Sequence, residues 1–230
     1  MSDCPYAFKK SRWSSHGTIL RKLATASRQS SILDVGTATG YLGEQLHKKG
    51  FVRVDGVESV PAWADQASAH YEKIYRTDLE AAVWPWESQK YDFIICADIL
   101  EHLKDPWAVL KRMRGCLAPG GTLIISLPNV AHWSMRLLLL CGRFRYSESG
   151  ILDKDHLRFF TYASARALIS QAGLKPIARS AVPLPVDRWS RSSWVGFLLR
   201  GVEIVDKVAA SALPSVAAFQ WVFFAQSSAE

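Results

Sequence analysis

The chain has 230 residues, of which 49% are hydrophobic and 21% are charged. These are the proportions of an average globular protein, so they argue against a disordered, collagen-like or coiled-coil chain. The length favours one domain over residues 1–230. Lys and Arg number 28 against 21 for Asp and Glu, which gives a net charge of +7. Because these basic residues form no dense block, we expect no nucleic-acid partner.

The cysteines and the apolar runs indicate the compartment. The chain contains four cysteines, Cys4, Cys96, Cys116 and Cys141. They lie far apart and form no CxxC pair, which argues against a zinc knuckle and a disulfide framework. The N-terminal residues lack the apolar core of a signal peptide, and the longest apolar run, residues 137–141, is far shorter than the roughly 20 residues of a membrane-spanning helix. We therefore expect a cytoplasmic protein with reduced thiols.

Short apolar runs alternate with helical patterns over most of the chain. The runs that predict strands are residues 31–36, 52–58, 73–78, 91–97, 122–127, 175–181 and 219–225. The patterns that predict helices are residues 41–50, 61–71, 105–118 and 161–172. This alternation predicts an α/β fold with a parallel sheet.

Caps and insertions complete the predicted outline. Asp105 and Pro106 are the residues preferred at the start of a helix, and residues 119–121, Pro-Gly-Gly, are predicted to close that helix. Residues 132–160 and 182–214 are irregular, aromatic-rich insertions. In a doubly wound sheet such insertions lie beyond the strand ends, so we expect them to contact the substrate.

A glycine-containing loop, Gly36-Thr-Ala-Thr-Gly40, follows the first predicted strand. At this place an open α/β sheet presents backbone N–H groups to a ligand. A dinucleotide-binding loop would need glycine at the positions of Ala38 and Tyr41. Asp34, in the preceding strand, repels a diphosphate and attracts an ammonium group, so the loop suits a zwitterionic ligand better.

Acidic residues also end the next two predicted strands. Glu58 lies about twenty residues beyond the loop, where a carboxylate accepts hydrogen bonds from ribose hydroxyls. Asp78 is placed to accept the exocyclic amine of an adenine, and Leu79 offers a flat apolar contact. Three acids at the ends of consecutive strands indicate an adenosine-containing ligand.

The chain resembles the class I S-adenosylmethionine-dependent methyltransferases over about residues 15–180. The matching segments are residues 32–40, 55–58, 77–78, 91–103 and 117–123. Thr37 stands where Cys, Ala or Ser is common in that family, which is a conservative change. Two later motifs, residues 98–103 and 155–161, resemble the branch that includes ubiquinone-biosynthesis O-methyltransferases and methyltransferases of polysaccharide pathways.

The resemblance implies a Rossmann-like, doubly wound sheet of seven strands, mostly parallel with an antiparallel last strand and helices on both faces. It implies S-adenosyl-L-methionine as the methyl donor, S-adenosyl-L-homocysteine as the product and a small-molecule acceptor. The residues implied for cofactor binding are Asp34, Gly36, Thr37, Gly40, Glu58, Asp78, Leu79, Ala97 and Asp98.

Two histidines are candidates for a general base. His102 follows the fourth predicted strand, and His156 lies in a charged stretch that we expect over the acceptor pocket. A neutral imidazole near pH 7 takes a proton from a phenol or a sugar hydroxyl. The alternative role of His102 is a single structural hydrogen bond at a helix start. Asp98, Glu101 and His102 alternatively form a divalent-metal site, an option that the resemblance raises and the sequence leaves open.

Residues 132–145 and 194–208 are amphipathic, with arginines and a lysine beside leucines and tryptophans. In one interpretation both cover the sheet and roof the acceptor pocket. In the other they rest on an anionic membrane surface and reach a lipid-linked acceptor.

We expect methyl transfer from S-adenosylmethionine to a hydroxyl oxygen of a phenol, a quinone precursor or a saccharide, lipid-linked or free. N-methylation stays open. The alternatives are an NAD-dependent oxidoreductase or epimerase on the same kind of sheet, a non-catalytic nucleoside-binding module, and an RNA methyltransferase. The sequence gives no indication of the oligomeric state.

Overall fold

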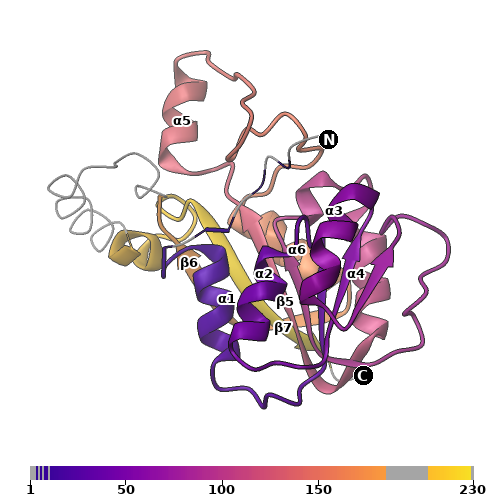
Figure 1. Ribbon diagram of the computed structural model, residues 1–230. Helices are drawn as coiled ribbons and strands as arrows, with labels where there is room; N and C mark the ends of the chain where they lie inside the picture. Colours follow the sequence, from indigo (N-terminus) through magenta and orange to yellow (C-terminus); the bar gives the residue numbers. More distant parts are fainter. Residues whose placement is uncertain (1–3, 5, 7, 10, 185–206, 229–230) are drawn as a thin grey trace, which may run out of the picture.

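The computed structural model describes residues 4, 6, 8, 9, 11–184 and 207–228 (Figure 1). Its centre is one seven-stranded sheet in the order β3-β2-β1-β4-β5-β7-β6. The strands are β1 Ile32–Val35, β2 Val54–Glu58, β3 Lys73–Arg76, β4 Tyr91–Ala97, β5 Leu117–Pro128, β6 Leu174–Val182 and β7 Gln220–Ser227. Strands β1 to β5 pair in parallel, and β7 is antiparallel to both of its neighbours. The predicted doubly wound sheet with an antiparallel last strand is confirmed.

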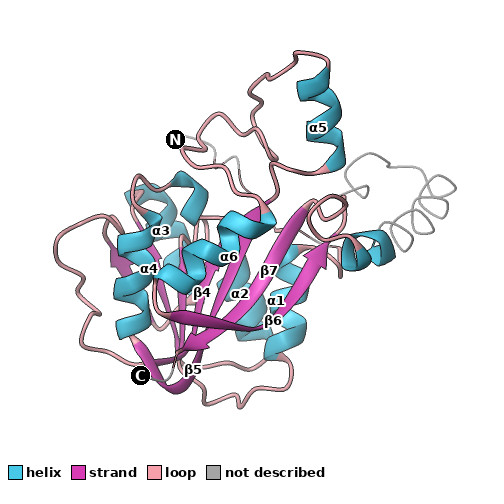
Figure 2. Cartoon of the chain, turned by 180° about the vertical axis from the view of Figure 1, so that it is seen from behind, coloured by secondary structure: helices cyan, strands magenta, loops and turns pink. Residues whose placement is uncertain are grey.

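Helices cover both faces of the sheet. The helices are α1 Ser15–Leu23, α2 Tyr41–Lys48, α3 Pro61–Ala67, α4 Pro106–Gly115, α5 Trp133–Leu140 and α6 Tyr162–Gln171, with short 3-10 turns η1 Ser68–His70 and η2 Leu100–His102. Residues 207–212 are also helical, and α5 stands clear of both faces of the sheet (Figure 1). One buried cluster joins α1 and α2 to the face seen in Figure 1, and a larger cluster joins α4 and α6 to the face seen in Figure 2. In the described part of the chain, no helix has the length and apolarity needed to cross a membrane.

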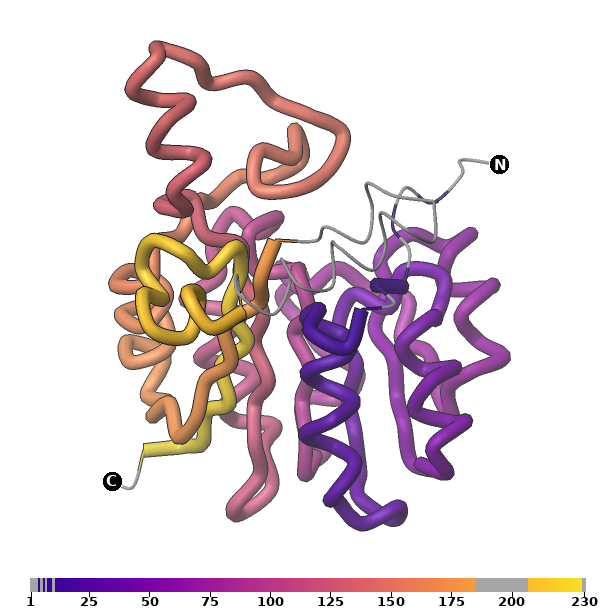
Figure 3. The backbone as a smooth tube through the Cα atoms, turned by 90° about the vertical axis from the view of Figure 1, so that its left-hand side faces the viewer, coloured from indigo at the N-terminus to yellow at the C-terminus, as the bar shows by residue number. Residues whose placement is uncertain are grey.

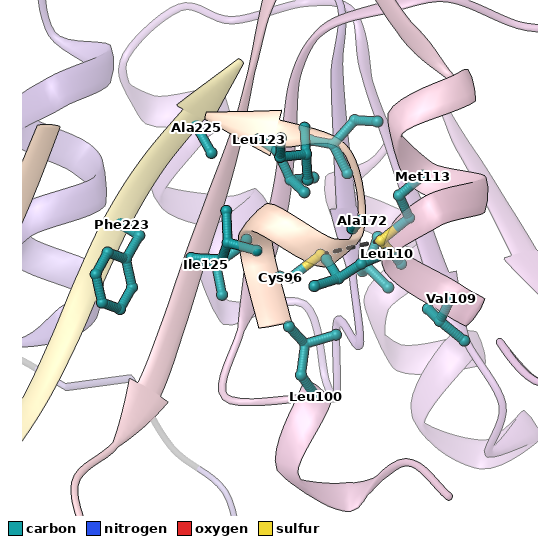
Figure 4. Close-up of a cluster of buried hydrophobic side chains, with 14 of the residues drawn as sticks. Cys96, Leu100, Val109, Leu110, Met113, Leu123, Ile125, Ala172, Phe223 and Ala225 are labelled. Atoms are coloured by element: carbon teal, nitrogen blue, oxygen red, sulfur yellow. Dashed lines mark hydrogen bonds between the residues drawn. The ribbon is translucent and has the colours of Figure 1, made fainter. Parts of the chain in front are cut away.

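The two cores follow from the alternation of side chains along each strand. In β4, Cys96 faces the α4 side, whereas Ile95 belongs to the cluster under α1 and α2. Figure 4 shows Met113 and Leu110 of α4 beside Cys96, whose thiol donates to the Met113 sulfur at 3.2 Å. Central strands buried on both faces read as unbroken apolar runs, which is why they were predictable.

Helix α1 was not predicted. The hydroxyl of Ser14 caps it by accepting the N–H of Gly17 at 3.1 Å, and Ile19 and Leu23 are fully buried against the sheet. A nine-residue helix with glycine in its first turn and a β-branched pair after it carries a weak helical signal. Its stability comes from packing rather than from propensity.

The prediction that Pro119-Gly-Gly121 closes α4 is wrong. The helix ends at Gly115, and residues 119–121 lie in the first part of β5. The pairing of β5 with β4 is irregular here, Gly120 has φ +75°, and a Cβ on Gly121 would lie 2.8 Å from the carbonyl oxygen of Tyr91. The glycines therefore serve a bulge in the strand.

A buried hydrogen-bond chain ties the sheet to α2. The hydroxyl of Tyr71 donates to Asp34 Oδ2 at 2.5 Å and accepts the backbone N–H of Gly43 at 3.1 Å. A Cβ on Gly43 would overlap the Tyr71 ring. Burial, with a contribution from the negative charge of Glu58, raises the pKa of Asp34 to about 7, although the Tyr71 hydrogen bond acts in the opposite direction.

Gly43→Ala should destabilise the fold by roughly 1–3 kcal/mol, because the new methyl group displaces the Tyr71 ring by overpacking. The control is Gly115→Ala, where a Cβ meets nothing within 4 Å. This control should leave the free energy of unfolding unchanged or raise it by up to about 1 kcal/mol. Urea unfolding of the three proteins measures the difference, and equal stability of the two variants would contradict the packing argument.

Asp34→Asn should flatten the pH dependence of stability. The folded pKa of Asp34, about 7, lies above its unfolded value, so the stability that it contributes is complete below the unfolded pKa and is lost as pH rises towards 7. The loss is at most about 1.4 kcal/mol per pH unit. Unfolding measured between pH 4 and 8 should show a smaller decline in the variant, and parallel curves would refute the raised pKa.

Candidate active site at the carboxyl ends of the strands

A cavity of about 680 Å³ opens at the carboxyl ends of β1, β2 and β4, where the strand order reverses. Open α/β sheets bind their ligands at this switch point. A second pocket of about 240 Å³ adjoins it. The residues shared by both linings are Gly36, Glu58, Ser59, Ile99 and His102. The two pockets therefore form one elongated site.

Glu58 joins the loop after β1 to the segment after β2. Its Oε2 accepts the backbone N–H of Ala38 at 2.8 Å, and its Oε1 accepts that of Val60 at 2.9 Å. Burial raises the pKa of the Glu58 carboxyl above its usual value, although these backbone hydrogen bonds act in the opposite direction. The carboxylate lines both pockets and retains lone pairs for further donors. A ligand in either pocket can therefore donate hydrogen bonds to this carboxylate.

The glycine loop needs both of its glycines. Gly36 has φ +75° and Gly40 φ +87°, and a Cβ on either would lie within 3 Å of a neighbouring atom. Gly36 lines both pockets. Gly40, Thr37 and Asp34 do not belong to either lining, and the last two are buried. These three residues support the loop and do not form the walls of the two pockets.

The smaller pocket contains the predicted adenine residues. Leu79 is a buried part of its wall, and Asp78 is exposed at its edge, where Oδ1 accepts the backbone N–H of Glu80 at 2.8 Å. The indole N–H of Trp84 donates to the carbonyl of Leu79 at 3.0 Å and fixes this wall. Asp78 and Leu79 thus lie in the pocket that adjoins Glu58, and their predicted contact with an adenine stays a prediction.

Asp98, next to Ala97 in the cavity lining, is held by residues from distant parts of the chain. Its Oδ1 accepts the Ser126 hydroxyl at 2.5 Å and the side-chain amide of Gln220, and its Oδ2 accepts the ammonium of Lys9. Burial alone would raise the pKa of Asp98, but Lys9 and these hydrogen bonds hold it well below its usual range. The sequence reasoning missed Lys9, Ser126 and Gln220. The sequence carries a signal for two of them, because Ser126 and Gln220 are polar residues within otherwise apolar strands.

Both candidate bases line the cavity, with their rings 4.8 Å apart. Nδ1 of His102 contacts the carbonyl of Asp155 at 3.0 Å, and Nδ1 of His156 contacts that of Ile151 at 3.1 Å. Because a carbonyl only accepts, each Nδ1 carries the proton and each neutral ring has a basic Nε2. Burial, followed by the neighbouring His102, lowers the pKa of His156.

Glu101 completes this cluster beneath the histidines. One ligand atom from each of Glu101, His102 and His156 lies within 4.8 Å of the others. Glu101 Oε2 is buried without a hydrogen-bond partner among the described residues, and burial raises the pKa of this carboxyl well above its usual range. One carboxylate and two imidazoles suit a divalent transition metal. The set differs from the predicted one, because Asp98 is engaged by Lys9 and His156 takes its place.

The first insertion supplies part of the cavity wall. The backbone N–H groups of Leu157 and Arg158 donate to the carbonyl of Glu101 at 2.8 and 2.9 Å, which positions His156 beside η2. Ser149, Gly150 and Asp153 of the same insertion also line the cavity. Of the second insertion, residues 182–184 line it, and residues 185–206 lie outside the described residues.

The cavity is acidic although the chain is basic. Among the described residues of its lining, the carboxyl groups are those of Glu58, Asp98, Glu101 and Asp153, and the one Lys or Arg is Lys9. Lys9 is already paired with Asp98. This arrangement favours a cationic or neutral ligand over an anionic one.

The chain matches a family described as a methyltransferase domain over residues 11–179. It is 28% identical over 168 residues to a ubiquinone biosynthesis O-methyltransferase of Cereibacter sphaeroides, a match that covers 70% of this chain and 66% of that protein. A protein of the same description from Coxiella burnetii is 33% identical over 102 residues, 43% of each chain. The matched regions thus span less than two thirds of these relatives.

Solved structures of low sequence identity share the fold. Magnesium protoporphyrin IX methyltransferase from Synechocystis, with bound S-adenosylhomocysteine, has a TM-score of 0.63 at 15% identity and covers 94% of this chain and 84% of its own. An N-methyltransferase from Bradyrhizobium japonicum, also with S-adenosylhomocysteine, has a TM-score of 0.58 at 16% identity and covers 97% and 91%. Because the family match spans well over half of the chain and includes the glycine loop, Glu58 and both histidines, the chain belongs to the class I S-adenosylmethionine-dependent methyltransferases.

Proposed function

We propose that the protein transfers a methyl group from S-adenosylmethionine to a hydroxyl oxygen of a small neutral acceptor. The observation that carries this proposal is the position of the Glu58 carboxylate, between the glycine loop and the two pockets at the switch point. The bound S-adenosylhomocysteine in proteins of the same fold supports the choice of donor.

The donor is assigned along the elongated site. The adenine occupies the smaller pocket beside Leu79 and Asp78, the ribose hydroxyls donate to Glu58, and the methionyl group lies by Gly36 and Asp98. A carboxylate accepts from two vicinal hydroxyls, which suits a ribose. The acidic lining favours the positively charged sulfonium of the donor over the neutral sulfide of the product.

The acceptor is assigned to the part of the larger cavity beside His102 and His156. Tyr6, Trp63 and Phe219 are among the aromatic residues that line the cavity and offer flat apolar surfaces to a ring. No unpaired lysine or arginine lies among the described lining residues, so a carboxylate or phosphate near the reacting atom would lack a partner. A neutral phenol or quinone precursor fits these walls, and the description of the ubiquinone-pathway relatives supports that class.

The reaction requires a proton acceptor and an in-line approach. The acceptor hydroxyl gives its proton to Nε2 of His102 or His156, and the oxygen attacks the methyl carbon. The carbon–sulfur bond breaks, and its electron pair remains on sulfur as S-adenosylhomocysteine forms. Glu101, His102 and His156 are the residues that would hold a divalent cation, which when bound lowers the pKa of a coordinated hydroxyl.

The NAD-dependent alternative loses its support, because the chain belongs to a methyltransferase family. The loop agrees with this conclusion: Ala38, at φ +48°, presents a methyl group where a dinucleotide loop has glycine.

Glu58→Ala should weaken S-adenosylhomocysteine binding at least tenfold, because a buried charged hydrogen bond contributes about 1.5–3 kcal/mol. Isothermal titration measures the dissociation constant, with NAD as the competing ligand that should not bind. Exposed Glu72→Ala is the matched control and should bind as the native protein does. An unchanged dissociation constant for Glu58→Ala would remove the ribose assignment.

His102→Ala and His156→Ala should keep S-adenosylhomocysteine affinity within about twofold, and the loss of the base should lower turnover on the order of 10²–10⁴-fold. Turnover is followed with labelled donor against a panel of phenols and catechols, with exposed His47→Ala as control. Metal content of the purified proteins and a chelator titration separate the two roles of the histidines. Metal lost from both variants indicates that the histidines are metal ligands, and metal retained indicates that they act as the base. Full turnover in both variants would exclude both histidines from catalysis.

A further inference from the structure

The first insertion, residues 132–160, is an arm that leaves the sheet after β5 and returns before α6. Figures 1 and 3 show α5 and the turn after it standing clear of the sheet and its covering helices. Its outer part therefore belongs to neither core of the domain.

The base of the arm is fixed. Met135 is buried against Ile151 and Leu152, and the three residues form a small cluster of their own. Ile151 and Leu152 belong to the part of the arm that leads back to α6, residues 151–160, which we call the returning limb. The backbone N–H of Trp133 donates to the carbonyl of Val216 at 2.8 Å, beside β7. The arm is thus a folded element with a defined orientation rather than a loose loop.

The tip of the arm exposes apolar side chains. Leu137, Leu138, Leu139 and Leu140 are 54%, 40%, 50% and 84% exposed. Phe144 and Tyr146 follow at 40% and 58%. Exposing four consecutive leucines to water costs free energy. An exposed apolar patch of this kind marks a site of contact with an apolar partner.

The same tip is positively charged. Arg136, Arg143 and Arg145 are exposed, and residues 130–147 contain no Asp or Glu. Within the described part of the chain, none of these arginines forms an ion pair. Two copies of this arm packed about a two-fold axis would oppose charges of the same sign. An anionic surface with an apolar interior complements both properties.

We propose that this arm docks the protein on an anionic lipid surface, with the leucines of α5 in the outer acyl layer and the arginines at the phosphate headgroups. The returning limb supplies Asp153 and His156 to the cavity wall, so the docked arm sets the acceptor end of the cavity close to the membrane. The latter step rests on the proposed function and assigns the acceptor to the class of membrane-dissolved phenols; the docking itself does not depend on methyl transfer.

The test is co-sedimentation of the full chain with sucrose-loaded vesicles of phosphatidylcholine, with or without phosphatidylglycerol, at low and at moderate salt. The native protein should bind the anionic vesicles at least tenfold more tightly than the neutral ones. The double variant Leu139→Asp/Leu140→Asp should bind the anionic vesicles more than tenfold more weakly. The variant Arg143→Gln/Arg145→Gln should lose about fivefold in vesicle affinity for each arginine. Val83→Asp, at a 74% exposed position between β3 and β4, is the matched control and should bind as the native protein does.

Three results would overturn the proposal. They are no sedimentation of the native protein with anionic vesicles at low salt, equal binding by the Leu139→Asp/Leu140→Asp variant, and a dimer in analytical ultracentrifugation that only this variant dissolves while vesicles bind neither protein. S-adenosylhomocysteine titration on the same samples separates the two proposals. Cofactor binding without vesicle binding rejects the lipid surface alone, and vesicle binding without cofactor binding rejects the methyltransferase assignment alone.

Discussion

The carboxylate of Glu58 is the interaction on which the site depends, because it connects the loop after β1 to the segment after β2 beyond the last backbone hydrogen bonds of the two strands. It accepts one backbone N–H from the loop after β1 and one from the start of the segment after β2. Ala38, one of its partners, has a positive φ, a conformation that non-glycine residues seldom adopt without support. Both partner N–H groups would be unpaired in a partly closed cavity without this carboxylate, and an unpaired buried donor costs about 1–3 kcal/mol. The same group thus shapes the loop and faces the ligand.

Charge is separated between the inside of the site and the outside of the molecule. The partly buried carboxylate of Asp98 remains ionised because Lys9, Ser126 and Gln220 satisfy it, which is the condition for keeping a charge largely away from water. The surplus of basic residues lies elsewhere, in part on the arm. A cationic donor therefore enters a negative cavity, while the surface as a whole attracts anions. The net charge of the sequence described only the second of these properties.

The sheet was predictable because its central strands are unbroken apolar runs, and the residues at their ends follow from topology alone. The errors have a different origin. Helix α1 carries Gly17 in its first turn and is stabilised by tertiary packing, which no local pattern reports. The Pro119-Gly-Gly121 segment has the composition of a helix stop, but its glycines serve a strand irregularity. The pairing of Lys9 with Asp98 joins residues 89 positions apart and left no trace in local sequence.

The histidine pair shows how the acceptor end differs from the donor end. The residues proposed to bind the donor lie at strand ends, which the sheet positions whatever the insertions do. His156 belongs to the arm, and it reaches His102 because the carbonyl of Glu101 accepts the N–H groups of Leu157 and Arg158. The acceptor end is therefore complete only when the returning limb of the arm is folded against η2. A displacement of this limb would move one histidine relative to the other without disturbing Glu58 or the glycine loop. In the proposed mechanism, donor affinity and turnover would for this reason depend on separate parts of the chain.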